Sequence, residues 1–179
     1  MKESLRSRRF VVFDLETTGL DPARHEIIEI GAVRVNQDAD VDDTFQALVK
    51  PRKRIPKAIT EMTGISQRMV NQEGRSLRSA MEELCAFIED LPLVSFNAEF
   101  DMAFLRNAAK GQNMVIRNPA SCALKMARRA WPGRTSYQLG DLAKDRKLSD
   151  EGTHRALGDC KRTVLIYAAA LSRVGLRRK

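Results

Sequence analysis

The segment Phe10–Leu20 has the sequence FVVFDLETTGL, in which an apolar run leads into two carboxylates and a turn. The run Phe10–Leu15 predicts a buried β-strand, because a continuous apolar stretch of this length ends at a glycine-containing turn. Alternate strand residues point to the same face, so we expect Asp14 and Glu16 to lie side by side. Two adjacent carboxylates repel each other unless a cation lies between them, and Gly19 permits a sharp turn and close approach by a ligand. The segment therefore predicts a strand that ends at a candidate cation site.

Two further strands are predicted early in the chain, at Ile27–Val35 and Thr44–Val49. The connections between the three strands are too short for helical crossovers, so we expect an antiparallel meander. Two short strands follow among helices, at Leu93–Phe96 and near Met114–Ile116. The predicted helices are Pro56–Met62, Leu77–Leu91, Ala98–Lys110, Ser121–Ala130, Leu139–Lys147 and a last helix after His154. This order predicts an α/β fold with a mixed five-stranded sheet flanked by helices.

Composition and length favour one folded domain. The chain has 179 residues, of which 43% are hydrophobic and 30% charged, and these are globular values. We expect a domain at residues 10–172 between a basic N-terminal extension, 1–9, and a basic C-terminal tail, 173–179. Three separated cysteines and the lack of a signal-peptide core favour a reducing, cytoplasmic location. No apolar run approaches the about 20 residues of a membrane helix, so no membrane partner is expected.

The charge favours an anionic partner. Lys and Arg number 31 against 23 Asp and Glu, which gives a net charge of +8. A strongly basic chain most often meets nucleic acid or a membrane surface, although basic proteins without such partners are common. Two stretches contain bases and no acid, Lys50–Lys57 and Lys125–Arg134, and the second surrounds Trp131. Each is either a solvated surface or a phosphate contact, and an aromatic residue among bases suits base stacking.

A second candidate element is SFNAEFD, residues 95–101. It places Asn97 and Asp101 one helical turn apart, directly after a predicted strand. Strand ends cluster in a mixed sheet, so Asp101 is a candidate neighbour of Asp14. Taken alone, the pair is better explained if Asn97 caps the helix and Asp101 faces solvent.

The third element is HRALGDC, residues 154–160. Asp159 would lie on a helix whose other face is apolar, which predicts partial burial, and a buried acid needs a partner. His154 lies at the start of this helix, where the positive end of the helix dipole favours a neutral imidazole. A neutral imidazole can accept a proton. The alternative is a surface histidine without a chemical role.

Each element is weak alone, but their conjunction resembles a known family. FDLETTGL, SFNAEFD and HRALGDC closely resemble, in this order, the three motifs of the DEDD 3′–5′ exonucleases, in the subgroup with a catalytic histidine. HEIIEIGAVRV, ITEMTGIS and SYQLGDLAKDRKLS are similar to segments of the proofreading (epsilon) subunit of bacterial DNA polymerase III and its standalone relatives. The resemblance covers roughly Phe10–Leu171, and no motif residue is missing.

The resemblance implies the ribonuclease H-like fold and phosphodiester hydrolysis with two divalent metal ions. Asp14, Glu16 and Asp159 would hold one ion, Asp14 would bridge to the second, and Asp101 would assist. His154 would be the general base that deprotonates the attacking water. Ligands that are all oxygen atoms suit Mg²⁺ or Mn²⁺ better than zinc.

The resemblance also implies which residues contact the terminal nucleotide. The expected contacts are Thr17, Thr18, Gly19, Leu20, Asn97 and Phe100. Leu20 is expected to wedge beside the last base and Phe100 to pack near it, although both are equally explained as ordinary packing residues.

We therefore predict a 3′–5′ exonuclease that releases nucleoside monophosphates from single-stranded 3′ ends, with DNA favoured over RNA. RNA remains an alternative, because related enzymes trim RNA ends with the same residues. A non-catalytic nucleic-acid-binding module is disfavoured by the intact acidic set, and a phosphatase usually has Asp at the position of Glu16. Few residues follow the last motif, so a long polymerase-tethering tail is not expected. Polymerase association therefore stays open, as does the choice between proofreading and standalone DNA repair or degradation.

Overall fold

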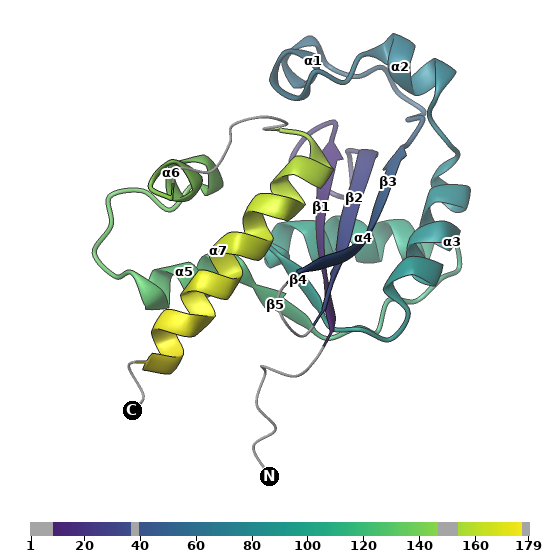
Figure 1. Ribbon diagram of the computed structural model, residues 1–179. Coiled ribbons are helices and arrows are strands. Elements are labelled where there is room, and N and C mark those ends of the chain that lie inside the picture. Colours follow the sequence, from purple (N-terminus) through teal and green to yellow (C-terminus); the bar gives the residue numbers. More distant parts are fainter. Residues whose placement is uncertain (1–8, 37–39, 147–153, 177–179) are drawn as a thin grey trace.

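The computed structural model describes residues 9–36, 40–146 and 154–176. These residues form a five-stranded sheet with the strand order β3-β2-β1-β4-β5 (Figure 1). The strands are β1 (Phe10–Thr17), β2 (Ile27–Val35), β3 (Val41–Leu48), β4 (Leu93–Ser95) and β5 (Ala120–Cys122). β1, β2 and β3 pair antiparallel, whereas β4 pairs parallel with both β1 and β5. The predicted meander and the mixed five-stranded sheet are therefore confirmed.

Helices cover both faces of the sheet. α3 (Leu77–Ile88) and α4 (Ala98–Gly111) lie on one face, and α7 (Ala156–Leu176) crosses the other beside α5 (Ala123–Ala130) (Figure 1). α1 (Lys57–Thr63) and α2 (Gln67–Gln72) lie beyond the edge at which β1 ends, and α6 (Leu139–Lys144) packs beside α7. Within the described part of the chain, no helix has both the length and the hydropathy needed to span a membrane.

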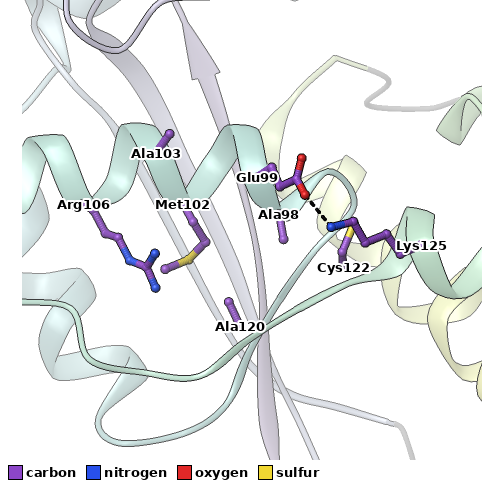
Figure 2. Close-up of a pocket in the computed structure, with 8 residues that line it drawn as sticks. All are labelled: Ala98, Glu99, Met102, Ala103, Arg106, Ala120, Cys122 and Lys125. Carbon is purple, nitrogen blue, oxygen red and sulfur yellow. Dashed lines mark hydrogen bonds and ion pairs between the residues drawn. The ribbon is translucent and has the colours of Figure 1, made fainter.

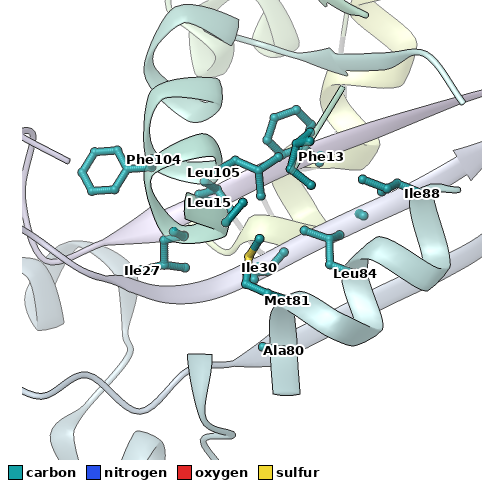
Figure 3. Packing of buried hydrophobic residues seen from close by; sticks show 14 of the residues in the cluster. Phe13, Leu15, Ile27, Ile30, Ala80, Met81, Leu84, Ile88, Phe104 and Leu105 are labelled. Carbon is teal, nitrogen blue, oxygen red and sulfur yellow. The ribbon is translucent and has the colours of Figure 1, made fainter. Parts of the chain in front are cut away.

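β1 has a continuous apolar run because both of its faces are covered. Phe13 and Leu15 pack with Leu84 of α3 and Leu105 of α4 in the larger core cluster (Figure 3). Val12 points the other way, into the cluster that includes side chains of α7. Asp14 and Glu16 have the same parity as Val12, so they share the face of the sheet that α7 covers.

The fifth strand differs from its prediction. It is β5, Ala120–Cys122, and not Met114–Ile116. Ile116 is buried but does not pair in the sheet, so this apolar residue packs in the core without belonging to a strand. The side-chain amide of Asn118 donates to the backbone oxygens of Glu89 and Leu91, at 3.0 and 2.8 Å, which holds the preceding loop beside β4 until pairing begins.

Several helix boundaries also differ. The predicted helix Leu77–Leu91 ends at Ile88, because Glu89 adopts a left-handed backbone conformation with φ of 49°. α2 was not predicted, since a helix of 6 residues with Val70 as its one buried side chain is too short to show a helical period. The predicted end of the helix Leu139–Lys147 lies outside the described residues, as do residues 1–8 of the predicted N-terminal extension and 177–179 of the predicted C-terminal tail. Residues 173–176 of the predicted tail continue α7.

Candidate functional site

Three carboxylates meet where β1 and α7 pack together. Asp14 and Glu16 come from the end of β1, and Asp159 comes from the first turn of α7. One oxygen of each carboxylate lies within 4.8 Å of the others. The fold thus brings the first and third sequence elements into one group, which we call the carboxylate cluster.

The carboxylate cluster is electrostatically unfavourable without a cation. Burial raises the pKa of Asp14 well above its usual value, and Asp101 and Asp159 add to this. Burial, followed by repulsion from Asp159 and Glu29, raises the pKa of Glu16 from 4.5 to about 8. Negative charges that are buried together favour proton uptake or a bound cation. The group therefore has the donor chemistry of a divalent metal site.

Asp101 comes from the first turn of α4, and two hydrogen-bond donors hold its carboxylate. Its carboxylate accepts a hydrogen bond from the Ser95 hydroxyl at the end of β4 and one from the backbone of Leu15. Burial nevertheless raises the pKa of Asp101 to about 7. The side chain is 4% exposed, so the interpretation of Asp101 as a solvated helix residue is wrong.

Asn97 occupies the N-cap position of α4, but its side chain makes no capping hydrogen bond. It is exposed beside the end of β4. The prediction that the Asn97 side chain caps the helix is therefore wrong, although the residue occupies the N-cap position, and the side chain is exposed to solvent.

Asp159 has an arginine partner three residues further along the helix. Nη2 and Nε of Arg162 lie 2.6 and 3.1 Å from Oδ1 of Asp159. The Arg162 side chain is 6% exposed, and an ion pair in such a setting is geometrically rigid. The partner that a buried Asp159 was expected to need is thus Arg162, a residue that the sequence reasoning did not single out.

A second unforeseen ion pair attaches the start of α7 to the sheet. Glu29 of β2 is fully buried and lies opposite Glu16 in the β1–β2 ladder. Its carboxylate accepts from Arg155 at 2.6 to 3.1 Å and from the backbone N–H of Ala156 at 2.9 Å. We call this group the Glu29 clamp. The one signal in the sequence was an acid flanked by isoleucines within a strongly apolar strand segment, Ile27–Val33.

Gly31 makes this close attachment sterically feasible. A Cβ at Gly31 would lie 2.5 Å from the carbonyl carbon of Ala156 and 2.5 Å from the backbone nitrogen of Leu157. The Cys160 thiol also contacts the Gly31 carbonyl oxygen, at 3.3 Å. The first turn of α7 therefore lies directly on the backbone of β2, which fixes the height of Asp159 above the sheet.

His154 is exposed at the start of α7, next to Arg155. Its backbone is left-handed, with φ of 56°. A non-glycine residue in this region costs about 1 kcal/mol or more and is usually held there by its surroundings. The Glu29 clamp supplies that constraint on the C-terminal side of His154.

The loop after β1 is ordered by its own hydrogen bonds. The Thr17 hydroxyl donates to the Gly19 carbonyl oxygen at 2.7 Å, and Thr18 exchanges two hydrogen bonds with Glu26, both 2.9 Å long. The ring of His25 packs on Gly19 so closely that a Cβ there would lie 2.3 Å from it. Leu20, at the tip of this loop, is 82% exposed.

Phe100 is half-buried, and its ring centroid lies 5.0 Å from that of Phe104 in α4. In the second basic stretch, Lys125–Arg134, Lys125 pairs with Glu99 and Arg134 pairs with Asp145. The guanidinium of Arg146, which lies outside this stretch, is 3.9 Å from the centroid of the Trp131 ring. One face of Trp131 is thereby covered, which argues against base stacking there.

A pocket lined by none of the residues of the carboxylate cluster lies between α4, β5 and the start of α5 (Figure 2). The ion pair between Glu99 and Lys125 crosses one side of it. Its lining residues are Ala98, Glu99, Met102, Ala103, Arg106, Ala120, Cys122 and Lys125. None of the predicted catalytic residues lines this pocket.

Comparison with known proteins gives concordant results. Residues 11–167 match the family model described as Exonuclease (RNase_T). The DNA polymerase III subunit epsilon of Aquifex aeolicus is 34% identical over 172 residues, which cover 96% of this chain and 84% of that protein. The PolC-type DNA polymerase III of Clostridium perfringens is 36% identical over 157 residues, and these cover 88% of this chain.

The chain spans only 11% of the length of that PolC-type relative. Among solved structures, the zinc-bound form of the complex between E. coli exonuclease I and single-stranded DNA is similar, with a TM-score of 0.81. The match covers 96% of this chain and 42% of that chain at 19% identity, which supports the fold.

Proposed function

The chain belongs to the exonuclease (RNase_T) family, and we propose that it is a metal-dependent 3′–5′ exonuclease acting on single-stranded 3′ ends. The observation that carries this proposal is the carboxylate cluster, in which three acids from β1 and α7 converge within 4.8 Å. No described cation other than Arg155 and Arg162 pairs with the acids around this site, so the repulsion favours a bound metal ion.

The donor set favours Mg²⁺ or Mn²⁺. All of the candidate ligand atoms are carboxylate oxygens, whereas zinc prefers nitrogen and sulfur. Asp14, Glu16 and Asp159 would hold one ion, Asp14 would bridge to a second, and Asp101 would assist. Such ions, when bound, would acidify water and stabilise charge on the leaving 3′ oxygen.

His154 would act as the general base. A neutral imidazole at the start of α7 can take the proton of the attacking water. The exposure of His154 would then let it pass the proton to solvent. The Glu29 clamp would fix the backbone from which this side chain extends.

The ordered loop Thr17–Leu20 and the exposed Asn97 would surround the terminal nucleotide. Thr17, Thr18 and Gly19 would contact it from a loop whose shape is held by hydrogen bonds of both threonine hydroxyls and of the Thr18 backbone N–H. The exposed side chain of Leu20 would wedge beside the last base. Phe100 of α4 would pack near the same base.

We favour DNA as the substrate, because the two relatives are named as a DNA polymerase III of the PolC type and as the epsilon subunit of DNA polymerase III. Association with a polymerase is consistent with the same relatives. We also predict a role in proofreading or DNA repair. The predicted location is the cytoplasm.

The test is a time course on 5′-labelled single-stranded DNA and RNA of matched sequence, with Mg²⁺, with Mn²⁺ and with chelator. A metal-dependent ladder that shortens from the 3′ end is expected. Asp14→Ala should abolish it, whereas the matched variant Asp90→Ala, which removes an exposed acid before β4, should not. Intact label under every metal condition, with the strand still bound, would favour a binding module. Faster cleavage of RNA would identify the substrate as RNA.

A further inference from the structure

The basic stretch Lys50–Lys57, which we call the basic loop, connects β3 to α1. β1 and β3 both run antiparallel to β2, so their carboxyl ends lie at the same edge of the sheet (Figure 1). Glu29 pairs with Glu16 on one side and with Leu48 on the other. Leu48 therefore lies two strands, or about 10 Å, from Glu16. The basic loop begins just beyond it, at the edge that holds the carboxylate cluster.

The basic loop is anchored to the loop that follows β1. The backbone N–H groups of Arg52 and Lys53 donate to the Glu26 carboxylate at 3.2 and 3.0 Å. Glu26 in turn exchanges two hydrogen bonds with Thr18. Partial burial would raise the pKa of Glu26, but these N–H groups and Arg52 lower it overall, so the anchor is ionised at neutral pH. The two loops thus keep a fixed relative position.

Most of the charge on the basic loop is not used for folding. The segment has five bases and no acid. The Arg52 side chain forms an ion pair with Glu26 at 3.2 Å, yet it is 92% exposed. The Lys57 side chain pairs with Glu61 at 3.3 Å and is 90% exposed. Lys53 and Arg54 are also exposed. Exposed pairs of this kind contribute about 1 kcal/mol or less to stability. Like charges held together on a fixed loop instead repel one another until an anion binds.

We infer that the basic loop binds backbone phosphates of the single strand upstream of its terminal nucleotide. This inference rests on the proposed function, because it assumes that a 3′ end enters the carboxylate cluster. A strand whose end is held by Thr17–Leu20 passes close to the anchored loop, since Glu26 joins the two. Arg52, Lys53 and Arg54 then neutralise phosphates without reading bases. The active site would therefore hold more than the nucleotide that is cleaved, and it would prefer longer strands.

The test compares wild type with the double variant Lys53→Ala/Arg54→Ala on two 5′-fluorescein oligothymidylates, a trinucleotide and a dodecanucleotide. Cleavage is measured with Mn²⁺, and binding is measured by fluorescence anisotropy in chelator. The matched control is Lys110→Ala/Arg117→Ala, which removes two exposed charges from the end of α4 and the loop before β5. Salt is varied between roughly 50 and 200 mM, because phosphate contacts set the salt dependence of binding.

The double variant should raise KM for the dodecanucleotide and leave kcat unchanged for both strands. Each lost phosphate contact lowers the salt slope by about 0.7, so two contacts lower it by about 1.4. If the double variant and wild type bind the strand equally at 1 M salt, this difference in slope makes the double variant bind roughly 25-fold more weakly than wild type at 0.1 M salt. The control should match wild type.

The inference would be overturned if wild type and the double variant cleaved both strands with equal KM values and had equal salt slopes of binding. Loss of kcat on the trinucleotide would also overturn it, because that loss would place these residues in the reaction itself. Absence of cleavage by wild type would instead contradict the proposed function, and the anisotropy measurement would still report whether the basic loop binds the longer strand.

Discussion

Raising the pH of the metal-free protein should lower its melting temperature, because the carboxylate cluster resists ionisation. The pKa of Glu16 rises from 4.5 to about 8 on folding. A carboxyl with a raised pKa in the folded state stabilises that state fully below pH 4.5, and the contribution is lost as the pH rises through about 8. The pKa values of Asp14 and Asp101 are raised in the same direction, so their contributions have the same sign.

The size of the effect follows from Glu16 alone. One pKa unit corresponds to about 1.4 kcal/mol, so a rise from 4.5 to about 8 corresponds to about 5 kcal/mol at full ionisation. Domains of this size lose roughly 2–4 °C of melting temperature per kcal/mol. We therefore expect a fall of roughly 10–20 °C between about pH 5 and pH 9 without metal.

The assay is scanning calorimetry across this pH range with chelator and with Mn²⁺. Mn²⁺ should restore the melting temperature at the alkaline end and have little effect at the acidic end, because ligand carboxyls must lose their protons before they bind metal. Glu16→Gln should flatten the metal-free curve, and the matched variant Asp90→Asn, at an exposed acid, should not. A metal-free melting temperature that stays level or rises with pH, or an equal fall in Glu16→Gln, would contradict the prediction.

Three further outcomes are expected. His154→Ala should reduce kcat by about 10²–10⁴-fold, the usual contribution of a general base, while calorimetry shows unchanged Mn²⁺ affinity; a loss of that affinity would make His154 a ligand instead. Glu29→Gln should destabilise the fold by about 1–3 kcal/mol in urea, since it removes a charge that holds Arg155, and it should lower kcat without raising KM. A kcat equal to wild type would separate the Glu29 clamp from catalysis. Gly31→Ala should cost about 1–3 kcal/mol by forcing α7 away from β2, and an unchanged urea midpoint would contradict that packing.

Local features of the fold could be predicted from the amino-acid pattern alone. The apolar run of β1 indicated burial on both faces of the strand. Consecutive strand residues point to opposite faces, so an uninterrupted apolar run makes both faces apolar. The short connections among β1, β2 and β3 determined their antiparallel pairing, since a crossover needs more residues. The parity of Asp14 and Glu16 placed both acids on one face.

Helix and strand assignments failed where the local pattern had more than one explanation. The buried Ile116 has the apolar character of a strand residue, but its segment packs without pairing. Asn97 has the residue type of a helix cap and makes no such bond. Local periodicity reports which residues are buried, but it does not report which backbone groups find partners.

The electrostatics of the site depend on how distant parts of the chain pack together. Asp14 and Asp159 meet because α7 packs on the face of the sheet to which Asp14 belongs, and the pKa of Asp14 is raised by its burial and by the other acids that this packing brings close. The arginine partners of Asp159 and Glu29, and the close approach that Gly31 permits, depend on the docking of a helix against a strand far away in the sequence. Coulomb energy and desolvation depend on distance and burial, and neither quantity is encoded within the few residues over which a sequence pattern can be seen.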